Sequence, residues 1–203
     1  MSGLTRTVLR ARIGSQLRFD GEQNIPTSGP LVLVCNHLSN IDPFLFGGFT
    51  PGTLFCMAKR ELFTNSFLRW VLLGCNCFPI NRGAPDRWAL RTSLEILARG
   101  GRLLVFVEGT RATTPGMKRV EAGVGFLVRR SRASVLPIAV WGTEQALPHG
   151  RVIPRRVPIT VRYGKPFTPH VQALQRPDDQ ALSDEIARAI AVLLPPPYRG
   201  VYA

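Results

Sequence analysis

Uninterrupted apolar runs, bounded by turn residues, are the first regular feature of this chain. The runs at 31–34, 103–107 and 135–140 contain no polar residue. An apolar stretch of that length fits a strand that is covered on both faces. Shorter or mixed segments predict further strands at 54–58, 77–80 and 157–163.

Apolar residues at helical spacing fill the intervals between these strands. Residues 85–98 and 121–130 show this spacing, and residues 178–194 show it most clearly, with acidic residues where a helix dipole favours negative charge. Strands that alternate with helices predict a single α/β domain with a mixed, largely parallel sheet flanked by helices. Residues 61–73 are also expected to be helical with a thick apolar face, and the pattern alone favours ordinary core for that face.

The N-terminal segment differs from the rest of the chain in its charge. Residues 1–18 hold four arginines and no acidic residue, while Leu9, Ile13 and Leu17 recur every four positions. This pattern predicts a basic helix ahead of the main domain at 19–203. Two interpretations are open: the helix rests on an anionic membrane surface, or it packs on the domain with its arginines in solvent.

A histidine and an aspartate follow the first apolar run. His37 comes just after the expected strand, and Asp42-Pro43 begins a helix, where Asp42 suits the N-cap and Pro43 the first helical position. An imidazole held by a carboxylate has a fixed tautomer and a stabilised imidazolium, as a general base requires. Taken alone, a turn histidine next to a helix cap would give the same spacing.

Three further stretches accompany this His-x4-Asp pair. They are Phe-Pro-Ile-Asn-Arg at 78–82, the strand and loop ending in Glu-Gly-Thr-Arg at 103–111, and the proline-containing strand at 135–140. With Asn-His-x-Ser-x-x-Asp first, these four blocks resemble those of the glycerolipid acyltransferases, the superfamily of glycerol-3-phosphate and lysophosphatidic acid acyltransferases. The resemblance spans about 25–166. The family usually has an acidic residue where Asn81 stands and proline where Val107 stands.

The resemblance implies a glycerol-3-phosphate acyltransferase-like fold and a specific reaction. A fatty acyl group would move from acyl-CoA or acyl carrier protein to the hydroxyl of a lysophospholipid, foremost 1-acyl-glycerol-3-phosphate, to give phosphatidate. On the matching positions, His37 would be the general base and Asp42 the carboxylate that orients it. The substrate-binding residues would be Arg82, Glu108, Gly109, Thr110 and Arg111.

These residue types suit a phosphorylated acceptor. Arg82 and Arg111 are expected to hold the phosphate, because a guanidinium fork matches phosphate oxygens and stays charged. Glu108 is expected to orient an arginine or the acceptor's free hydroxyl, and Gly109 permits close approach of the backbone. The sequence has no Gly-x-Ser-x-Gly elbow, so direct attack by the acceptor hydroxyl is the expected mechanism. No metal or tightly bound cofactor is expected.

The charge of the chain points to an anionic partner. Lysine and arginine number 26 against 13 acidic residues, which gives a net charge of +13. Such a field favours acidic lipid, a phosphorylated substrate or nucleic acid. Nucleic acid is not expected, because no binding motif for it is present and the charges are scattered along the chain. A non-catalytic basic protein that binds membrane or nucleic acid is therefore the less favoured alternative, and a lyso-amino-acid lipid or glycolipid acceptor is another.

The apolar content and the cysteines bear on location. No run reaches the roughly 18 to 20 apolar residues that span a bilayer, and no signal-peptide pattern is present. The four cysteines lie in apolar surroundings without zinc-site spacing, which favours reduced, buried thiols. The sequence therefore predicts a peripheral protein at the cytoplasmic face of the membrane.

Overall fold

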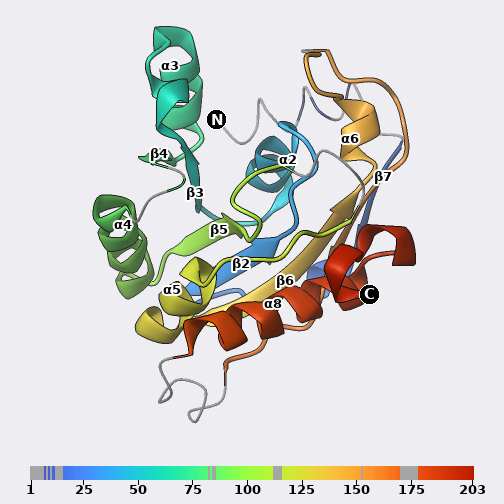
Figure 1. Cartoon of the computed structure of the whole chain (residues 1–203). Helices are drawn as coiled ribbons and strands as arrows, with labels where there is room; N and C mark the ends of the chain where they lie inside the picture. The colour runs from blue at the N-terminus through green and yellow to red at the C-terminus, as the bar shows by residue number, and fades with distance from the viewer. Residues whose placement is uncertain are drawn as a thin grey trace.

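A seven-stranded sheet organises the chain in this computed structural model (Figure 1). The structure describes residues 7, 9, 11, 16–81, 83, 86–111, 116–151, 153–169 and 178–203. Across the sheet the strands follow the order β1-β7-β6-β2-β5-β3-β4. Their bounds are β1 Leu17–Asp20, β2 Leu31–Cys35, β3 Leu54–Lys59, β4 Cys77–Ile80, β5 Arg102–Phe106, β6 Ser134–Trp141 and β7 Ile159–Tyr163.

Every neighbouring pair of strands in this sheet is parallel except β6 and β7, which are antiparallel. This arrangement confirms the predicted mixed, largely parallel sheet. The strand β2 lies centrally, between β5 and β6, so its carboxyl end meets the carboxyl ends of both neighbours at one edge of the sheet. Loops that leave this edge are where parallel α/β sheets place their functional groups.

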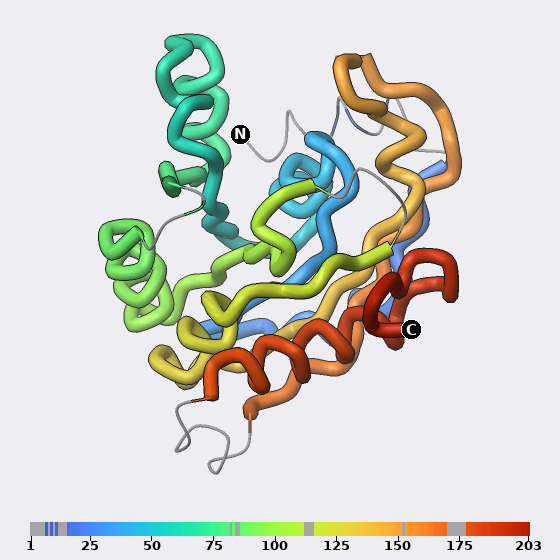
Figure 2. The backbone as a smooth tube through the Cα atoms, viewed as in Figure 1, coloured from blue at the N-terminus to red at the C-terminus, as the bar shows by residue number. Residues whose placement is uncertain are grey.

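Helices cover both faces of the sheet. In Figure 1, α5 and α8 cross the near face and α2 lies behind the sheet, and Figure 2 traces the same backbone path from the N-terminal to the C-terminal residues. The α-helices are α2 Asp42–Phe49, α3 Ser66–Gly74, α4 Arg87–Ala98, α5 Gly123–Ser131, α6 Thr143–Ala146 and α8 Asp179–Leu193. Short 3-10 helices lie at Glu22–Asn24, Arg60–Phe63, Pro196–Tyr198 and Gly200–Tyr202.

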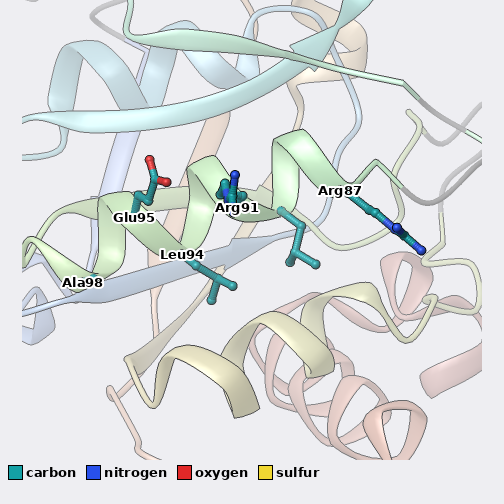
Figure 3. Close-up of a pocket in the computed structure, with 6 residues that line it drawn as sticks. Arg87, Arg91, Leu94, Glu95 and Ala98 are labelled. Carbon is teal, nitrogen blue, oxygen red and sulfur yellow. The ribbon is translucent and has the colours of Figure 1, made fainter.

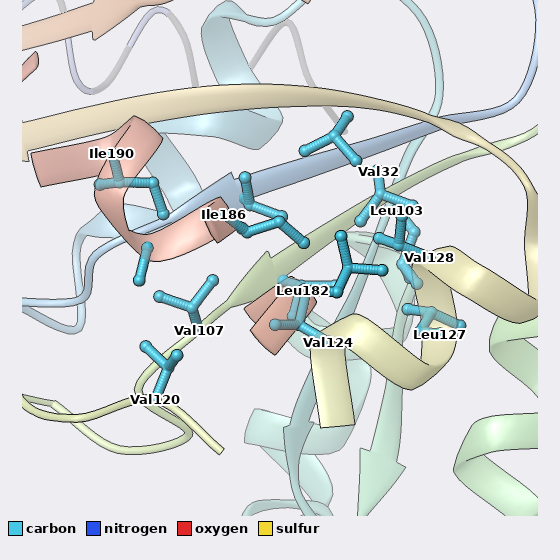
Figure 4. Packing of buried hydrophobic residues seen from close by; sticks show 14 of the residues in the cluster. Val32, Leu103, Val107, Val120, Val124, Leu127, Val128, Leu182, Ile186 and Ile190 are labelled. Carbon is cyan, nitrogen blue, oxygen red and sulfur yellow. The ribbon is translucent and has the colours of Figure 1, made fainter. Parts of the chain in front are cut away.

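The central strand has no solvated face, as its apolar run predicts. Val32 and Val34 point into the layer formed with α4, α5 and α8, where they meet residues such as Leu127 and Ile186 (Figure 4). The alternate residues Leu31, Leu33 and Cys35 point into the opposite layer, which contains Phe46 of α2. All five residues of β2 are at most 1% exposed. The strand is therefore a rigid base for the residues that follow it.

Close helix packing supports the layer on the α8 side. Gly125 of α5 lies so near α8 that a Cβ built on it would be 2.0 Å from the carbonyl oxygen of Asp179. Its amide donates a hydrogen bond to the Ser183 hydroxyl at 2.9 Å, and Arg129 pairs with Asp179. The absence of a side chain at Gly125 thus serves helix–helix contact.

The predicted basic helix over residues 1–18 is wrong for its last two residues. Leu17 and Arg18, expected in the basic helix, belong to β1, because β7 presents an open edge and Leu17 pairs with Ile159 there. Of the residues before 16, only positions 7, 9 and 11 are described, and all three are helical. Leu9 is buried against Ile41, Leu45 and Ile159. The rest of the expected helix lies outside the described residues, and its contact with lipid stays a prediction.

The helical prediction for residues 61–73 is confirmed for most of the segment, but the helix is interrupted and its apolar face is not core. The segment divides into the 3-10 helix Arg60–Phe63 and α3, with Asn65 accepting a hydrogen bond from Leu68 N as the cap of α3. The apolar face is not core, since no residue of α3 is buried. The helix projects beyond the end of β3 in Figure 1, and its Leu72 is partly buried against the core.

Candidate active site

The residue before the histidine fixes the end of the central strand. Asn36 is 1% exposed, and its side-chain amide donates to the Val140 carbonyl oxygen at 2.8 Å and accepts from the Val140 N–H at 2.9 Å. These two bonds extend the pairing of β2 with β6 beyond the last ladder residue, Cys35. His37 therefore leaves the sheet from a position that is held on its N-terminal side.

His37 and Asp42 form a buried pair. His37 Nδ1 lies 2.8 Å from Asp42 Oδ2, and the two residues are 5% and 0% exposed. The same carboxylate oxygen accepts the backbone N–H groups of Leu38 and Ser39, each at 2.8 Å. Since a carboxylate can only accept, Nδ1 carries the proton, and Nε2 is the ring nitrogen able to take one. The two residues are thus in contact, and their catalytic roles stay a prediction.

The predicted capping role of Asp42 is wrong. Asp42 is the first residue of α2, Ile41 is the N-cap, and Ile41 makes no side-chain cap bond. The aspartate carboxylate points back onto the turn at 37–39, because three donors converge there on one oxygen. Its other oxygen, Oδ1, is buried without a hydrogen-bond partner among the described residues. Asp42 thus holds the histidine and its turn.

The neighbouring strand β5 supports the imidazole from one side. The ring of Phe106, the last residue of β5, stacks on the His37 ring with centroids 4.0 Å apart and planes inclined by 21°. Phe106 also lies 6.4 Å from Phe46 of α2, so the apolar contact continues into the core. The histidine is fixed by a hydrogen bond in its plane and an aromatic ring on its face.

Glu108 joins the two strand ends through backbone atoms. Its Oε1 accepts the His37 N–H at 3.3 Å, and its Oε2 accepts the Lys118 N–H at 3.1 Å. Burial raises the pKa of this carboxyl group above its ordinary value, although the two amide bonds act in the opposite direction. In the described part of the chain, Glu108 contacts no arginine side chain, and its expected role of orienting an arginine or the acceptor hydroxyl stays a prediction.

The remaining motif residues follow Glu108 in a tight turn. Gly109 has a φ of 65°, which glycine adopts without strain, and its amide donates to the Phe106 carbonyl oxygen at 3.0 Å. The Thr110 amide donates to the Glu108 carbonyl oxygen at 2.7 Å. Arg111 is half-buried and has no ion pair with another described residue. Arg82 lies outside the described residues, so the structure does not place it.

The two other reactive side chains of this region are engaged elsewhere. Cys35 is fully buried, and burial, with the nearby carboxylates of Asp42 and Glu108, raises the pKa of its thiol well above the ordinary value. The Ser39 hydroxyl donates to the Leu147 carbonyl oxygen at 2.8 Å. Neither group has the geometry of an activated nucleophile, which requires a base within hydrogen-bond reach.

Three contributors to this site escaped the sequence prediction. Asn36 is part of the quoted motif, and its position just after a buried strand is the signal from which its backbone contact could have been predicted. Phe106 and Lys118 carried no signal, because a stacking ring and a main-chain amide become recognisable only when β2 and β5 are paired. The four cysteines are free thiols, of which Cys75 alone is half-buried and the others are buried.

Other features of the described residues do not add to this site. An open groove runs along α4 and is lined by Arg87, Leu90, Arg91, Leu94, Glu95 and Ala98 (Figure 3). It shares no residue with the His37 site. Within the described ranges no three His, Cys, Asp or Glu side chains cluster as metal ligands would, and no helix is long and apolar enough to cross a bilayer.

The fold and the buried pair together define an α/β protein with a histidine–aspartate pair at the carboxyl edge of its central strand. A family model described as Acyltransferase matches residues 16–141. The chain belongs to this acyltransferase family. The matched residues include the pair, the Asn36 contact and the Glu108 turn.

Relatives of the chain carry consistent names. A 1-acyl-sn-glycerol-3-phosphate acyltransferase of Bacillus subtilis is 28% identical over 139 residues, which cover 68% of this chain and 67% of the relative. A Chlamydomonas reinhardtii protein of the same name is 30% identical over 189 residues, which cover 89% of this chain and 53% of the relative. The chain thus spans about half to two thirds of the length of these proteins.

The fold has a counterpart among solved structures. The crystal structure of the 1-acyl-sn-glycerophosphate acyltransferase PlsC from Thermotoga maritima is similar with a TM-score of 0.76. The match covers 95% of this chain and 78% of that chain, at 24% sequence identity. At this identity the likeness shows a common fold, and it confirms the predicted fold class.

Proposed function

We propose that this protein transfers a fatty acyl group from a thioester to the hydroxyl of a lysophospholipid, with His37 as general base and Asp42 as the group that orients it. The observation that carries this proposal is the 2.8 Å contact between His37 Nδ1 and Asp42 Oδ2 in a buried turn. It fixes the tautomer in which Nε2 has a free lone pair. A base of this kind typically contributes about 10²- to 10⁴-fold to a rate.

The proposed reaction is a direct transfer. The acceptor hydroxyl gives its proton to His37 Nε2 as its oxygen bonds to the thioester carbonyl carbon, and a tetrahedral oxyanion forms. The carbonyl then re-forms, the carbon–sulfur bond breaks, and the thiolate leaves with the proton from the imidazolium. The engagement of the Cys35 and Ser39 side chains supports a route without an acyl-enzyme.

The acceptor is best taken as 1-acyl-glycerol-3-phosphate. Arg111 follows the Glu108 turn without a carboxylate partner among the described residues, so its fork is available for phosphate oxygens. Arg82 is assigned the same role from the sequence motif. The names of the relatives favour this acceptor as well.

One observation keeps a different lysolipid acceptor as the second candidate. Asn81, where the family usually has an acidic residue, accepts a hydrogen bond from Arg60 Nε at 2.6 Å. The same arginine pairs with Asp86 Oδ2 at 3.9 Å, so its carboxylate partner comes from another position than the usual acidic residue. A lyso-amino-acid lipid or a glycolipid would have to use that altered surface in place of the usual one.

The donor and the location follow from charge. Acyl-CoA is polyanionic and acyl carrier protein is acidic, and a chain of net charge +13 attracts both. The same charge supports action at an anionic membrane surface as a peripheral protein. The cytoplasmic face stays a prediction of the sequence.

One experiment tests the proposal directly. Purified full-length protein would be incubated with acyl-CoA or acyl carrier protein and a panel of lysolipids, and the products would be identified by mass. We expect phosphatidate from 1-acyl-glycerol-3-phosphate, and its loss in His37→Ala. Product from a lysolipid without phosphate only would favour the second candidate, and no acylated product with any acceptor would contradict both.

A further inference from the structure

The outer side of α3 exposes a contiguous set of large apolar side chains. Phe67 is 70% exposed, Trp70 64% and Leu73 52%. Positions three apart lie on one face of a helix, and the rings of Phe67 and Trp70 are 6.4 Å apart. Leu62 and Leu68, each 41% exposed, extend the set. We call these residues the α3 apolar face.

This face belongs to an ordered helix that is held from its inner side. Leu72 and Cys75 pack against the core layer on the α2 side of the sheet, as does Phe63 just before α3. The Asn65 side chain caps the helix by accepting from the Leu68 amide at 3.0 Å. The exposed aromatic residues are therefore presented on a supported helix, which lowers the entropic cost of binding.

The topology places the α3 apolar face on the same edge of the sheet as the catalytic pair. The helix follows β3, which runs parallel to β5, and β5 runs parallel to β2, the strand that delivers His37. In Figures 1 and 2, α3 projects past that edge, away from the body of the domain. Its inner residue Leu72 shares an apolar cluster with Phe106, the residue that stacks on His37.

The charges around this face are those that suit anionic lipid. Arg69 is the only charged residue of α3, and it is exposed. Before α3, Lys59 pairs with Glu61 at 3.3 Å and Arg60 pairs with Asp86 at 3.9 Å, so Arg69 is the positive charge that has no ion pair in this described stretch. Tryptophan, phenylalanine and leucine with flanking arginine form the combination that enriches at membrane interfaces.

We propose that the α3 apolar face inserts into the interfacial layer of an anionic membrane and sets the distance between the lipid surface and the His37 edge. This inference rests on the proposed function, because a fixed orientation at the membrane is useful only if the acceptor is a lipid. A second copy of this chain is a poorer occupant. Two aromatic side chains of roughly 150–250 Å² each, only partly exposed, and three leucines fall well short of the roughly 800 Å² that each partner of a standard interface buries.

Insertion makes a prediction that attraction by charge alone does not. Purely electrostatic binding to vesicles fades when the Debye length falls from about 10 Å at 0.1 M salt to about 3 Å at 1 M salt. The apolar component of binding survives that change. Full-length protein should therefore keep a measurable affinity for phosphatidylcholine vesicles containing phosphatidylglycerol at about 1 M salt.

The test compares two variants by vesicle sedimentation. In the double variant Phe67→Ser, Trp70→Ser, the partition coefficient at high salt should fall at least about tenfold, because two large apolar groups no longer leave water. The matched control is Val192→Ser. Val192 is 74% exposed as well, but it lies on α8 and outside the α3 apolar face. The control should stay within about twofold of the parent chain. Equal partition of the double variant and the parent chain would overturn the inference.

Two further measurements keep the alternatives apart. Tryptophan emission should shift to the blue when vesicles are added to the parent chain, and Trp70→Phe should bind with that shift largely removed. If the parent chain is a dimer that dissociates in the double variant while vesicle binding is unchanged, the α3 apolar face binds a second copy of the chain and not the membrane. These assays contain no acyl donor, so they hold whether or not transfer occurs. Conversely, the double variant should acylate a water-soluble short-chain acceptor as fast as the parent chain does. If neither protein acylates that acceptor, the result counts against the proposed function alone.

Discussion

Asn36 holds Val140 through both atoms of its side-chain amide, at 2.8 Å to the carbonyl oxygen and 2.9 Å to the amide nitrogen. The contact imitates one more step of the ladder between β2 and β6, although the residue that makes it has already left the strand. His37 is next in sequence, so the position of the imidazole depends on this contact from one side and on Glu108 from the other. Asn36 is a positioning residue for the proposed base.

Removing the Asn36 amide should therefore affect stability and turnover together. Asn36→Ala leaves the buried N–H and C=O of Val140 unpaired, at about 1–3 kcal/mol each, so we expect a loss of roughly 2–6 kcal/mol in the free energy of unfolding. At a temperature where the variant is folded, kcat should fall more than KM rises. Denaturant unfolding and steady-state kinetics provide both values. Ser93→Ala, which removes a buried hydroxyl of α4 outside the site, should cost stability and leave kcat unchanged.

His37→Ala should abolish transfer and leave the fold intact. The expected loss in kcat is at least about 10²- to 10⁴-fold, because the variant lacks the group that takes the hydroxyl proton. Circular dichroism and thermal unfolding would verify the fold, and a thioester-cleavage assay would measure the rate. Turnover near that of the parent chain would contradict the mechanism.

Asp42→Asn should impair activity for a reason that the structure redefines. An asparagine would meet the three donors of Asp42 Oδ2 either with a neutral carbonyl oxygen, which stabilises an imidazolium less, or with its NH₂ group, which favours the wrong histidine tautomer. We expect a large fall in kcat with the loss of stability located in the turn at 37–39. Nitrogen-15 spectra of the His37 ring report the tautomer directly. A variant with the parental tautomer and parental activity would show that Asp42 acts in another way.

The sequence predicted the core of this site better than its surroundings. Completely apolar strands such as β2 can only be buried, and a histidine–aspartate pair five residues apart has few ways to meet across a turn. The capping prediction for Asp42 failed because an aspartate at a helix start can turn its carboxylate forwards or backwards, and only the packed turn decides. The core prediction for α3 failed because helical periodicity describes which residues share a face and leaves open what that face meets. Leu17 entered β1 because the edge of β7 needed a partner, a tertiary effect that local spacing does not register.

Glu108 should give stability a specific dependence on pH. Its pKa in the folded protein is raised from 4.5 by burial, so between pH 4.5 and the folded pKa the native state binds more protons than the unfolded state. The free energy of unfolding contributed by this group is therefore largest below pH 4.5 and falls as pH rises through the folded pKa. Relative to Glu108→Gln, the parent chain should lose stability over that window. Urea unfolding of both proteins at a series of pH values measures the difference, and a difference that rises with pH would contradict the assignment.

Arg111 provides the sharpest test of the acceptor. If its guanidinium holds the acceptor phosphate, Arg111→Ala should raise the KM for 1-acyl-glycerol-3-phosphate more than the KM for the acyl donor. A hydrogen bond to a charged group contributes roughly 1.5 to 3 kcal/mol, which corresponds to a loss of about 10- to 150-fold in kcat/KM. Arg111→Lys should restore only part of that loss, since a point charge cannot bind two phosphate oxygens as the planar fork does.

Arg82→Ala should have the same effect as Arg111→Ala, because the sequence motif assigns both arginines to the phosphate. Arg119, another basic residue of the loop that leads to α5, is the control, and Arg119→Ala should leave both KM values within about twofold of the parent chain. An unchanged acceptor KM in both Arg111→Ala and Arg82→Ala would remove the phosphate assignment and direct attention to an acceptor that carries no phosphate.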